Sequence, residues 1–386
     1  MLYETKKSTV PIPSVGADGE RSIPENCTKS IANSHEEINL SDAICEESLD
    51  EILDRLNRQM DPNRLRTVTM NDLYDAVYRG KPPIIDGLLY PGTYLFAGAP
   101  KVGKSFFMAQ LAYHVSTGLK LWDYDVKQGT VLYLALEDDY QRLQERMFRM
   151  FGIEGSDCLY FAVVAKQLGQ GLDQQLTNFM QEHPDTKLII VDTLQKVREI
   201  GGESYSYAND YDIVGQMKRF ADQNGICMLL VHHTRKQTAG DKFEMISGTN
   251  GLLGCADGAF LMHKEKRTDM SATLDIVGRD QPDQKLFLIR DPERLVWNLD
   301  HAEAEKHEKK PDPLLGKIAA ILSDRQPTWE GSATDLTGLI DEEILPNRLT
   351  RKLNVLSSEL LDTYGILYTV KRTSYGSWIR LKRQNP

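Results

Sequence analysis

Apolar residues gather in short continuous runs through the middle of the chain, and periodic amphipathic stretches separate several of these runs. Continuous apolar runs of strand length are typical of parallel strands that are covered on both faces. Later runs alternate more between apolar and polar residues, which predicts antiparallel pairing in the last part of the sheet. The pattern therefore predicts an α/β domain with a mostly parallel, twisted sheet. The continuous runs are 93–97, 131–136, 159–163, 188–191 and 226–231, and the alternating runs are 258–263, 272–278 and 285–290.

The pattern changes on either side of this region. Residues 1–65 open with a polar stretch rich in Ser, Glu, Asn and Pro, which predicts disorder followed by a lead-in helix over 49–56. A second short helix is predicted over 71–78, and residues 301–312 are expected to form a charged linker. In the last unit, 313–386, helices precede two strands, an order that resembles a small winged-helix-like α+β domain. These elements are predicted at 314–322, 332–339, 348–361, 367–372 and 378–382.

Charge is unevenly distributed along the chain. There are 56 acidic and 46 basic residues, a net charge of −10, which excludes a simple basic nucleic-acid binder. Residues 347–386, however, hold eight basic residues against two acidic ones, whereas residues 1–60 hold twelve acidic residues against six basic ones. This asymmetry predicts an anionic partner at the C-terminal end, and the candidate partner is duplex DNA.

Cysteine spacing and hydropathy narrow the class of protein further. The five cysteines are scattered without a C-x-x-C pair, which argues against a disulfide framework and a zinc site. The first residues lack the apolar core of a signal peptide, and no apolar run reaches the length of a membrane span. These features predict a cytoplasmic protein without a membrane partner.

The most specific motif is a phosphate-binding loop, G-A-P-K-V-G-K-S, which lies between a predicted strand and a predicted helix. Backbone N–H groups of such a loop face a polyphosphate, and the helix dipole points at the same anion. Lys104 is expected to reach the β- and γ-phosphates of ATP, and Ser105 is expected to hold Mg²⁺. A plain glycine turn would leave the Lys-Ser pair unexplained. The predicted nucleotide-binding residues are Gly98, Ala99, Pro100, Lys101, Val102, Gly103, Lys104, Ser105 and Phe106.

Two carboxylates follow predicted strands. Asp192 ends an apolar run, the position at which P-loop enzymes hold the Mg²⁺ shell, and its alternative role is a helix N-cap. Glu137 follows the run 131–136, on a strand expected beside the P-loop, and is predicted to orient or deprotonate the attacking water. The alternative is an acidic helix start that favours the helix dipole, which is the role we expect for Asp138 and Asp139.

Two histidines and one arginine complete the candidate catalytic set. Adjacent residues of a strand point to opposite faces, so His232 and His233 cannot readily share a metal ion. We expect His233 to face the γ-phosphate as a polar sensor and His232 to pack. Arg279 ends a predicted strand, and it is expected either to act on a neighbouring subunit's γ-phosphate as an arginine finger or to pair with Asp280.

Two polar loops stand at 201–210 and 234–247. Loops after strands at the active edge of such a sheet often carry function. Their glycine, aromatic and basic residues suit contacts with single-stranded DNA, because bases stack on aromatic rings and phosphates pair with cations. Ordinary mobile surface loops are an alternative of equal weight.

Taken in order, four motifs resemble a known family. G-A-P-K-V-G-K-S, L-Y-L-A-L-E-D-D, L-I-I-V-D-T-L and L-L-V-H-H-T-R-K are similar to motifs of the RecA-like ATPases of the RepA hexameric helicase group, relatives of DnaB-type replicative helicases. The resemblance covers about residues 66–300. It implies a RecA-like P-loop fold in which Glu137 is the catalytic glutamate, Asp192 the Walker B aspartate and His233 the second His of a sensor pair.

One stretch departs from that family. Ser247-Gly248-Thr249 resembles the turn that precedes the finger arginine in RepA, but the stretch that follows here, 252–257, holds no arginine. Arg279 stands where DnaB-like proteins carry basic finger residues on a later strand. It is therefore the candidate finger.

The resemblance implies an ATP- and Mg²⁺-dependent motor that forms a homo-hexameric ring and acts on single-stranded DNA. Its expected task is replication of a plasmid, phage or integrated element, as a helicase. Two alternatives stay open. One is a recombination mediator that forms filaments on DNA, and the other is a nucleotide-switched DNA-binding regulator without unwinding activity.

Overall fold

In the computed structural model, the chain divides into two units, residues 1–67 and 68–386. The polar N-terminal stretch, the predicted lead-in helix and most of both polar loops lie outside the described residues, so those predictions are untested. Across the described part, no helix combines the length and the apolar character that crossing a membrane requires. The structure describes residue 65 and residues 67–198, 207–234, 243, 246, 251–266, 268–279, 281–304, 312–340, 343–373 and 376–384.

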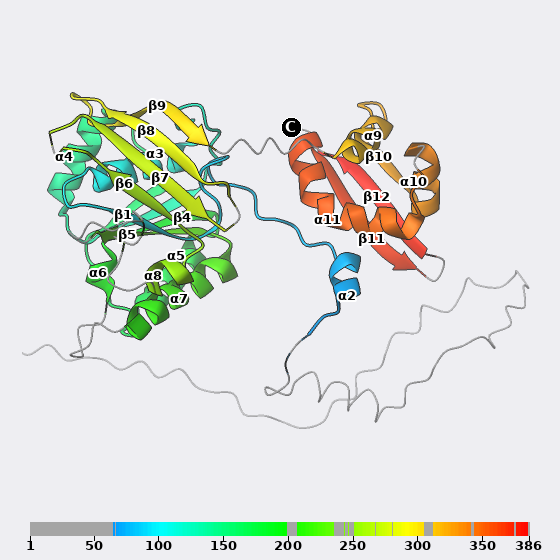
Figure 1. Cartoon of the computed structure of the whole chain (residues 1–386), viewed down its shortest axis with the longest axis horizontal. Helices are drawn as coiled ribbons and strands as arrows, with labels where there is room; N and C mark the ends of the chain where they lie inside the picture. Colours follow the sequence, from blue (N-terminus) through cyan, green and yellow to red (C-terminus); the bar gives the residue numbers. More distant parts are fainter. Residues whose placement is uncertain are drawn as a thin grey trace, which may run out of the picture. The chain divides into compact units, whose positions relative to one another are not determined.

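A nine-stranded sheet forms the centre of the larger domain (Figure 1), in the order β3-β2-β4-β5-β1-β6-β7-β8-β9. The strands from β3 to β6 in this order run parallel, and the pairs from β6 to β9 are antiparallel. The mostly parallel sheet of a P-loop ATPase is thus confirmed. The strands are β1 (Gly92–Gly98), β2 (Thr130–Ala135), β3 (Leu159–Ala162), β4 (Thr186–Asp192), β5 (Cys227–His233), β6 (Gly258–His263), β7 (Ser271–Gly278), β8 (Gln284–Arg290) and β9 (Trp297–Ala304).

Two of these strands differ from the sequence-based expectation. β6 was expected in the antiparallel part, yet it pairs parallel with β1 on one side and antiparallel with β7 on the other. It is buried over Gly258–Met262, as the centre of a covered sheet requires. β9 was not predicted, because its polar residues Asn298, Asp300 and His301 resemble the start of the charged linker.

Helices cover both faces of this sheet. Because successive side chains of a strand point to opposite faces, Phe96 packs in the layer with α3 and α4, and Leu95 packs in the layer with α5 to α8. Each face therefore has its own apolar core, which explains the continuous apolar runs. The helices are α3 (Lys104–Thr117), α4 (Tyr140–Phe151), α5 (Leu172–Glu182), α6 (Leu194–Val197), α7 (Tyr207–Asn224) and α8 (Gly251–Cys255).

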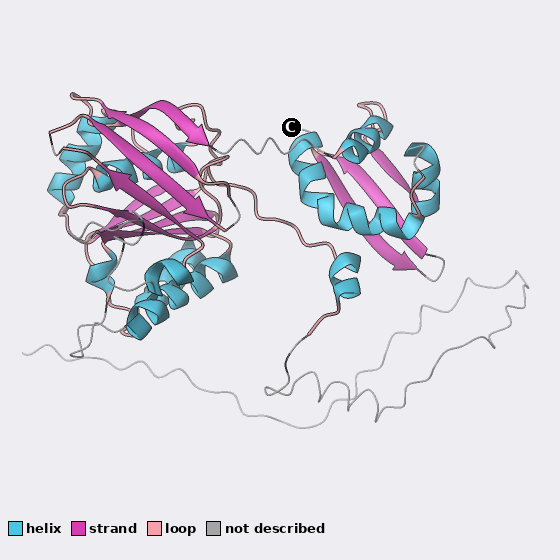
Figure 2. Cartoon of the chain, viewed as in Figure 1, coloured by secondary structure: helices cyan, strands magenta, loops and turns pink. Residues whose placement is uncertain are grey.

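The C-terminal residues form a second sheet with its own core. β10, β12 and β11 lie side by side in that order, and both pairs are antiparallel (Figure 2). β10 was not predicted, because it is short, contains Gly331 and is largely exposed. A six-residue helix near residue 71 is also present, shorter than predicted. The elements are α2 (Met70–Asp75), α9 (Pro313–Ile321), β10 (Thr328–Ser332), α10 (Ala333–Ile340), α11 (Pro346–Tyr364), β11 (Ile366–Thr373) and β12 (Gly376–Arg383).

Candidate active site

The four strands that carry the sequence motifs are neighbours in the sheet, in the order β2-β4-β5-β1. Because they are parallel, the residues at their carboxyl ends meet at one edge. Gly98 is the register partner of His233, and Ala135 is the partner of Asp192. One expectation was wrong: the strand before Glu137 is not beside the P-loop strand, since β4 and β5 lie between them. We call this edge of the sheet the P-loop edge.

Two glycines of the P-loop are required by close approaches. A Cβ atom on Gly98 would lie 2.6 Å from the carbonyl oxygen of Met262. Gly103 has φ +112°, and a Cβ there would lie 2.7 Å from the Trp297 ring. Trp297 is fully buried and opens β9, so a strand that the sequence did not reveal packs against the phosphate-binding loop.

Lys104 begins α3, and its ammonium group lies inside the site, where the residue is only 5% exposed. Nζ donates to the carbonyl oxygens of Gly98 at 2.7 Å and Ala99 at 3.1 Å. Burial lowers the pKa of Lys104 to about 8, and the charges of Asp192 and Glu137 oppose that fall. The buried cation is thus poorly solvated, and a γ-phosphate would stabilise its charged form.

His233 faces Lys104, with Nδ1 of the imidazole 3.0 Å from Nζ. Burial lowers the pKa of His233, and the Lys104 charge lowers it further. A neutral imidazole that accepts from the ammonium group at Nδ1 satisfies both observations, and it leaves Nε2 as a donor. Sequence reasoning selected His233 over His232 for a polar role at this position, and the structure brings His233 to the P-loop.

Asp192 is 5% exposed at the end of β4. Its Oδ2 accepts a hydrogen bond of 2.9 Å from the hydroxyl of Tyr133, and Ser105 also donates to its carboxylate. Burial raises the pKa of Asp192, while these hydrogen bonds lower it. The hydroxyl and carboxylate oxygens of Ser105 and Asp192 are therefore in contact, and hard oxygen ligands of this kind suit Mg²⁺ that arrives with nucleotide phosphates.

Glu137 lies one residue beyond Leu136, whose N–H donates to the Asp192 carbonyl oxygen at 2.8 Å. Its Oε1 accepts a hydrogen bond of 3.2 Å from the hydroxyl of the buried Thr193. Thr193 follows Asp192, so the two carboxylates are linked through adjacent residues of one chain segment. This places Glu137 among the groups that surround Lys104, where its charge acts on the lysine.

The two acids after Glu137 have structural partners, as expected. Asp139 is the N-cap of α4, and its side chain accepts from the Arg142 N–H at 2.8 Å. Asp138 forms a bidentate contact with Arg146, at 2.7 and 3.1 Å, and both side chains are nearly buried. Both acids therefore have structural roles at the start of α4.

Cations and aromatic rings gather beside the P-loop, and only part of this group was anticipated. Two guanidinium groups lie over the ring of Phe106, which follows Ser105. The guanidinium of Arg290, at the end of β8, is 4.3 Å from the ring centroid, and that of Arg146 is 5.1 Å from it. Lys264 lies over Trp297 at 5.2 Å. β6 and β8 run in the same direction as β1, so Lys264 and Arg290 both lie at the P-loop edge.

Arg279 is not part of this cluster. It follows β7, which runs opposite to β6, and its N–H donates to the carbonyl oxygen of Asp257, just before β6 begins. Its guanidinium is exposed and donates to the Gly254 carbonyl at 3.2 Å. Arg279 therefore lies at the edge of the sheet opposite the P-loop, away from Lys104 and Asp192.

Sequence reasoning missed three residues that contact the predicted site residues and support them. Tyr133 lies within an apolar strand, where its hydroxyl gave no signal. Thr193 was visible beside Asp192 and could have been flagged as a hydroxyl at a strand end. Trp297 lies 194 residues from Gly103 in the chain, and no local pattern connects them.

A comparison with known protein families matches the part of the chain that contains the P-loop. Residues 59–239 match the AAA_25 family, described as an AAA domain, which confirms the resemblance to P-loop ATPases. No curated protein matches the chain. The fold assignment rests on the strand order and the strand-end motifs described above.

Three similar solved structures share little sequence identity with the chain. One of them, an ATPase domain, is 13% identical and matches 65% of this chain and 98% of its own, with a TM-score of 0.47. A DnaB-like replicative helicase is 14% identical over 65% of this chain and 66% of its own, also with a TM-score of 0.47. The KaiC-like protein PH0186 from Pyrococcus horikoshii OT3 is 14% identical over 57% and 98%, with a TM-score of 0.40.

Proposed function

We propose that this chain, whose residues 59–239 match an AAA domain, is an ATP-driven motor that forms a ring on single-stranded DNA and acts as a replicative helicase. The observation that carries the proposal is the convergence of Lys104, Asp192 and His233 at one sheet edge, with Glu137 beside them. An ATPase core of this type suits the replication of a plasmid, phage or integrated element.

In this proposal the site hydrolyses ATP by positioning and electrostatics. Lys104 exchanges its contacts with the loop carbonyls for the β- and γ-phosphate oxygens and offsets their charge. Glu137 orients a water molecule and accepts its proton as the water oxygen bonds to the γ-phosphorus and the bond to ADP breaks. His233, in contact with Lys104, is placed to respond when the γ-phosphate leaves. Ser105 and Asp192 would hold Mg²⁺, which would supply positive charge to the phosphates.

A ring is favoured by the position of Arg279. The residue lies at the opposite sheet edge from the P-loop, so any role of its exposed guanidinium in hydrolysis must be at a site in another subunit. A finger supplied by a neighbour makes hydrolysis depend on assembly. Arg290 is less suited to this role, because it stacks on Phe106 beside the P-loop of its own subunit.

The C-terminal domain is proposed to be a winged helix that binds duplex DNA. Its order of elements, α9-β10-α10-α11-β11-β12, ends in a hairpin, and the sheet order is β10-β12-β11. In a winged helix the last helix before the hairpin enters the major groove, and here that helix is α11. The excess of basic residues over 347–386 agrees with this role.

One set of assays separates the proposed helicase from its two alternatives. We expect the purified chain with ATP and Mg²⁺ to displace the labelled strand of a forked duplex, and light scattering to show a closed ring of defined mass. The Lys104→Ala variant is the matched control without hydrolysis. Strand exchange with open-ended filaments would favour the recombination mediator instead. Site-specific duplex binding with slow hydrolysis and no displacement would favour the regulator.

A further inference from the structure

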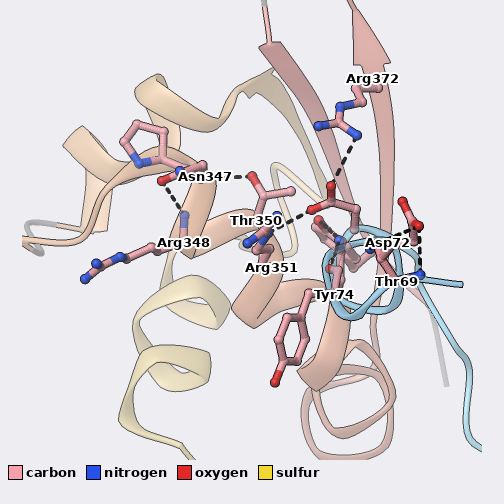
Figure 3. Close-up of polar contacts among 12 residues, drawn as sticks. Thr69, Asp72, Tyr74, Asn347, Arg348, Thr350, Arg351 and Arg372 are labelled. Atoms are coloured by element: carbon pink, nitrogen blue, oxygen red, sulfur yellow. Dashed lines mark hydrogen bonds and ion pairs between the residues drawn. The ribbon is translucent and has the colours of Figure 1, made fainter.

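The short helix α2 lies against α11 and β11 of the C-terminal domain, where polar groups of these elements meet (Figure 3). Asp75 at the end of α2 accepts from Nε of Arg351 on α11 at 2.8 Å, and its other oxygen lies 3.2 Å from Nη1 of Arg372 on β11. Two backbone contacts extend the interaction. Asn354 donates to the Tyr74 carbonyl at 2.9 Å, and the Gly80 N–H donates to Oγ of Ser358 at 2.7 Å.

This contact is mostly polar. The half-buried Val77 packs against the apolar core of the C-terminal domain, and the other contacts named here are hydrogen bonds and ion pairs. None of the described residues Met70–Asp75 that form α2 is buried, and a helix of this length is marginal on its own. The Arg351 and Arg372 side chains keep 39% and 81% of their surface exposed, so water and salt screen both ion pairs. Segment 69–80 is therefore held in a way that a competing anion can reverse.

Asp75 differs from the other acids that pair with basic residues of this domain. Lys352 pairs with Asp312, Arg380 with Glu330 and Arg383 with Asp324, and each of these acids belongs to the C-terminal sequence itself. Asp75 instead comes from 276 residues earlier in the chain, on the far side of the ATPase sequence.

The two arginines that meet at Asp75 come from the elements expected to face DNA. Arg351 lies on the proposed recognition helix and Arg372 lies on the strand that leads into the hairpin turn. Two guanidinium groups on one oxyanion form a site that also suits a phosphate, because both anions accept paired N–H donors. Arg348, one turn before Arg351, is also exposed.

We propose that Asp75 occupies a backbone-phosphate position of duplex DNA, and that segment 69–80 covers the DNA-binding face of the C-terminal domain until DNA displaces it. The inference rests on the proposed duplex-binding role of this domain. The segment offers the two arginines one carboxylate, whereas duplex DNA offers many phosphates. Because phosphate contacts release counterions, the affinity for duplex DNA rises as the salt concentration falls, and DNA then displaces the segment. Binding of duplex DNA then frees the segment that leads directly into the ATPase domain.

The test compares two charge-neutralising variants of the full chain, Asp75→Asn and Asp324→Asn, in binding an end-labelled mixed-sequence duplex by fluorescence anisotropy. Each variant removes one carboxylate that pairs with an arginine of the C-terminal domain, so both change the net charge of the chain equally. We expect Asp75→Asn to bind about two- to tenfold more tightly than wild type, since it releases two exposed ion pairs. Asp324→Asn should change affinity by less, and Arg351→Ala should weaken binding severalfold.

Hydrogen exchange gives a second readout that needs no variant. Addition of the same duplex should speed amide exchange in peptides that cover 69–80, because Gly80 loses its acceptor on Ser358. One result would overturn the inference alone: the duplex binds, amide exchange over 69–80 is unchanged, and Asp75→Asn and Asp324→Asn have the same duplex affinity. Segment 69–80 then does not cover the DNA-binding face, while the DNA-binding role stands. If wild type shows no salt-sensitive duplex binding and Arg351→Ala changes nothing, the DNA-binding role fails and the inference falls with it.

Discussion

The two edges of the central sheet use similar residue types for different purposes. At the P-loop edge, Lys104 and Asp192 are buried and their pKa values are shifted, so their charges lack full solvation. At the opposite edge, Asp257 pairs with Lys218 and accepts from the Thr93 N–H at 2.9 Å, and Arg279 is exposed. The first arrangement has charges that a ligand can satisfy, whereas the second locks the start of β1.

This difference separates an edge suited to bind a charged ligand from a structural one. A carboxylate matched by an ammonium group and a backbone donor, like Asp257, has no further need of a ligand. A lysine whose donors end on loop carbonyls, like Lys104, gains when a phosphate replaces them. Substitutions at the P-loop edge should therefore affect catalysis far more than folding.

The largest expected effect comes from Lys104→Ala. Loss of the buried cation removes the charge that faces the phosphates, and we expect ATP turnover to fall by at least about a thousandfold, with the fold intact. A coupled ATPase assay measures the rate, and circular dichroism checks the fold. Turnover near the wild-type rate would show that the P-loop edge is not the nucleotide site.

Glu137→Gln should be the next most severe change. The amide keeps the shape of the side chain and its contact with Thr193 but cannot accept a proton, so hydrolysis should slow at least about a hundredfold while ATP still binds. Fluorescent-nucleotide titration measures binding beside the rate. Asp138→Asn is the matched control, because Asp138 is held by Arg146 and should have a smaller effect on chemistry. If Asp138→Asn slowed hydrolysis more than Glu137→Gln, Asp138 would be the general base.

Arg279→Ala tests whether the opposite edge acts in trans. Binding of ATP should be spared, and turnover should fall at least about tenfold in the assembled protein. Mixing Arg279→Ala with Lys104→Ala subunits should restore part of the activity, since some interfaces then join an intact P-loop to an intact finger. A normal rate in Arg279→Ala alone contradicts the trans role. If the variant is inactive and mixing restores nothing, Arg279 supports the fold.

The pH dependence of ATP binding should follow the protonation of the buried Lys104 ammonium group. Its pKa is about 8 without nucleotide, so the charged form is lost as pH rises through that value. Affinity should thus be full at pH 7 and about tenfold weaker at pH 9. Lys104→Arg is the control, because arginine stays charged and its affinity should be flat over that interval. An equal slope in both proteins would assign the titration to another group.

Much of the fold and of the candidate site's layout could be predicted from sequence, because strand-end motifs and parallel pairing place residues at one edge. Asp192 and His233 were assigned in this way. Strand order could not be predicted, since the pattern of apolar residues does not say that β4 and β5 lie between β2 and β1. Contacts across long separations, such as Trp297 under Gly103 or Asp75 on Arg351, likewise leave no local signal.

The most direct test of the proposed motor is the steady-state ATPase rate of the purified full chain with Mg²⁺, measured with and without single-stranded DNA. The account predicts hydrolysis that single-stranded DNA accelerates severalfold and that Lys104→Ala abolishes in both conditions. Equal rates with and without single-stranded DNA, at concentrations where the DNA is bound, would contradict the motor and leave only an ATPase. Absence of hydrolysis in wild type would contradict the assignment of the P-loop edge itself.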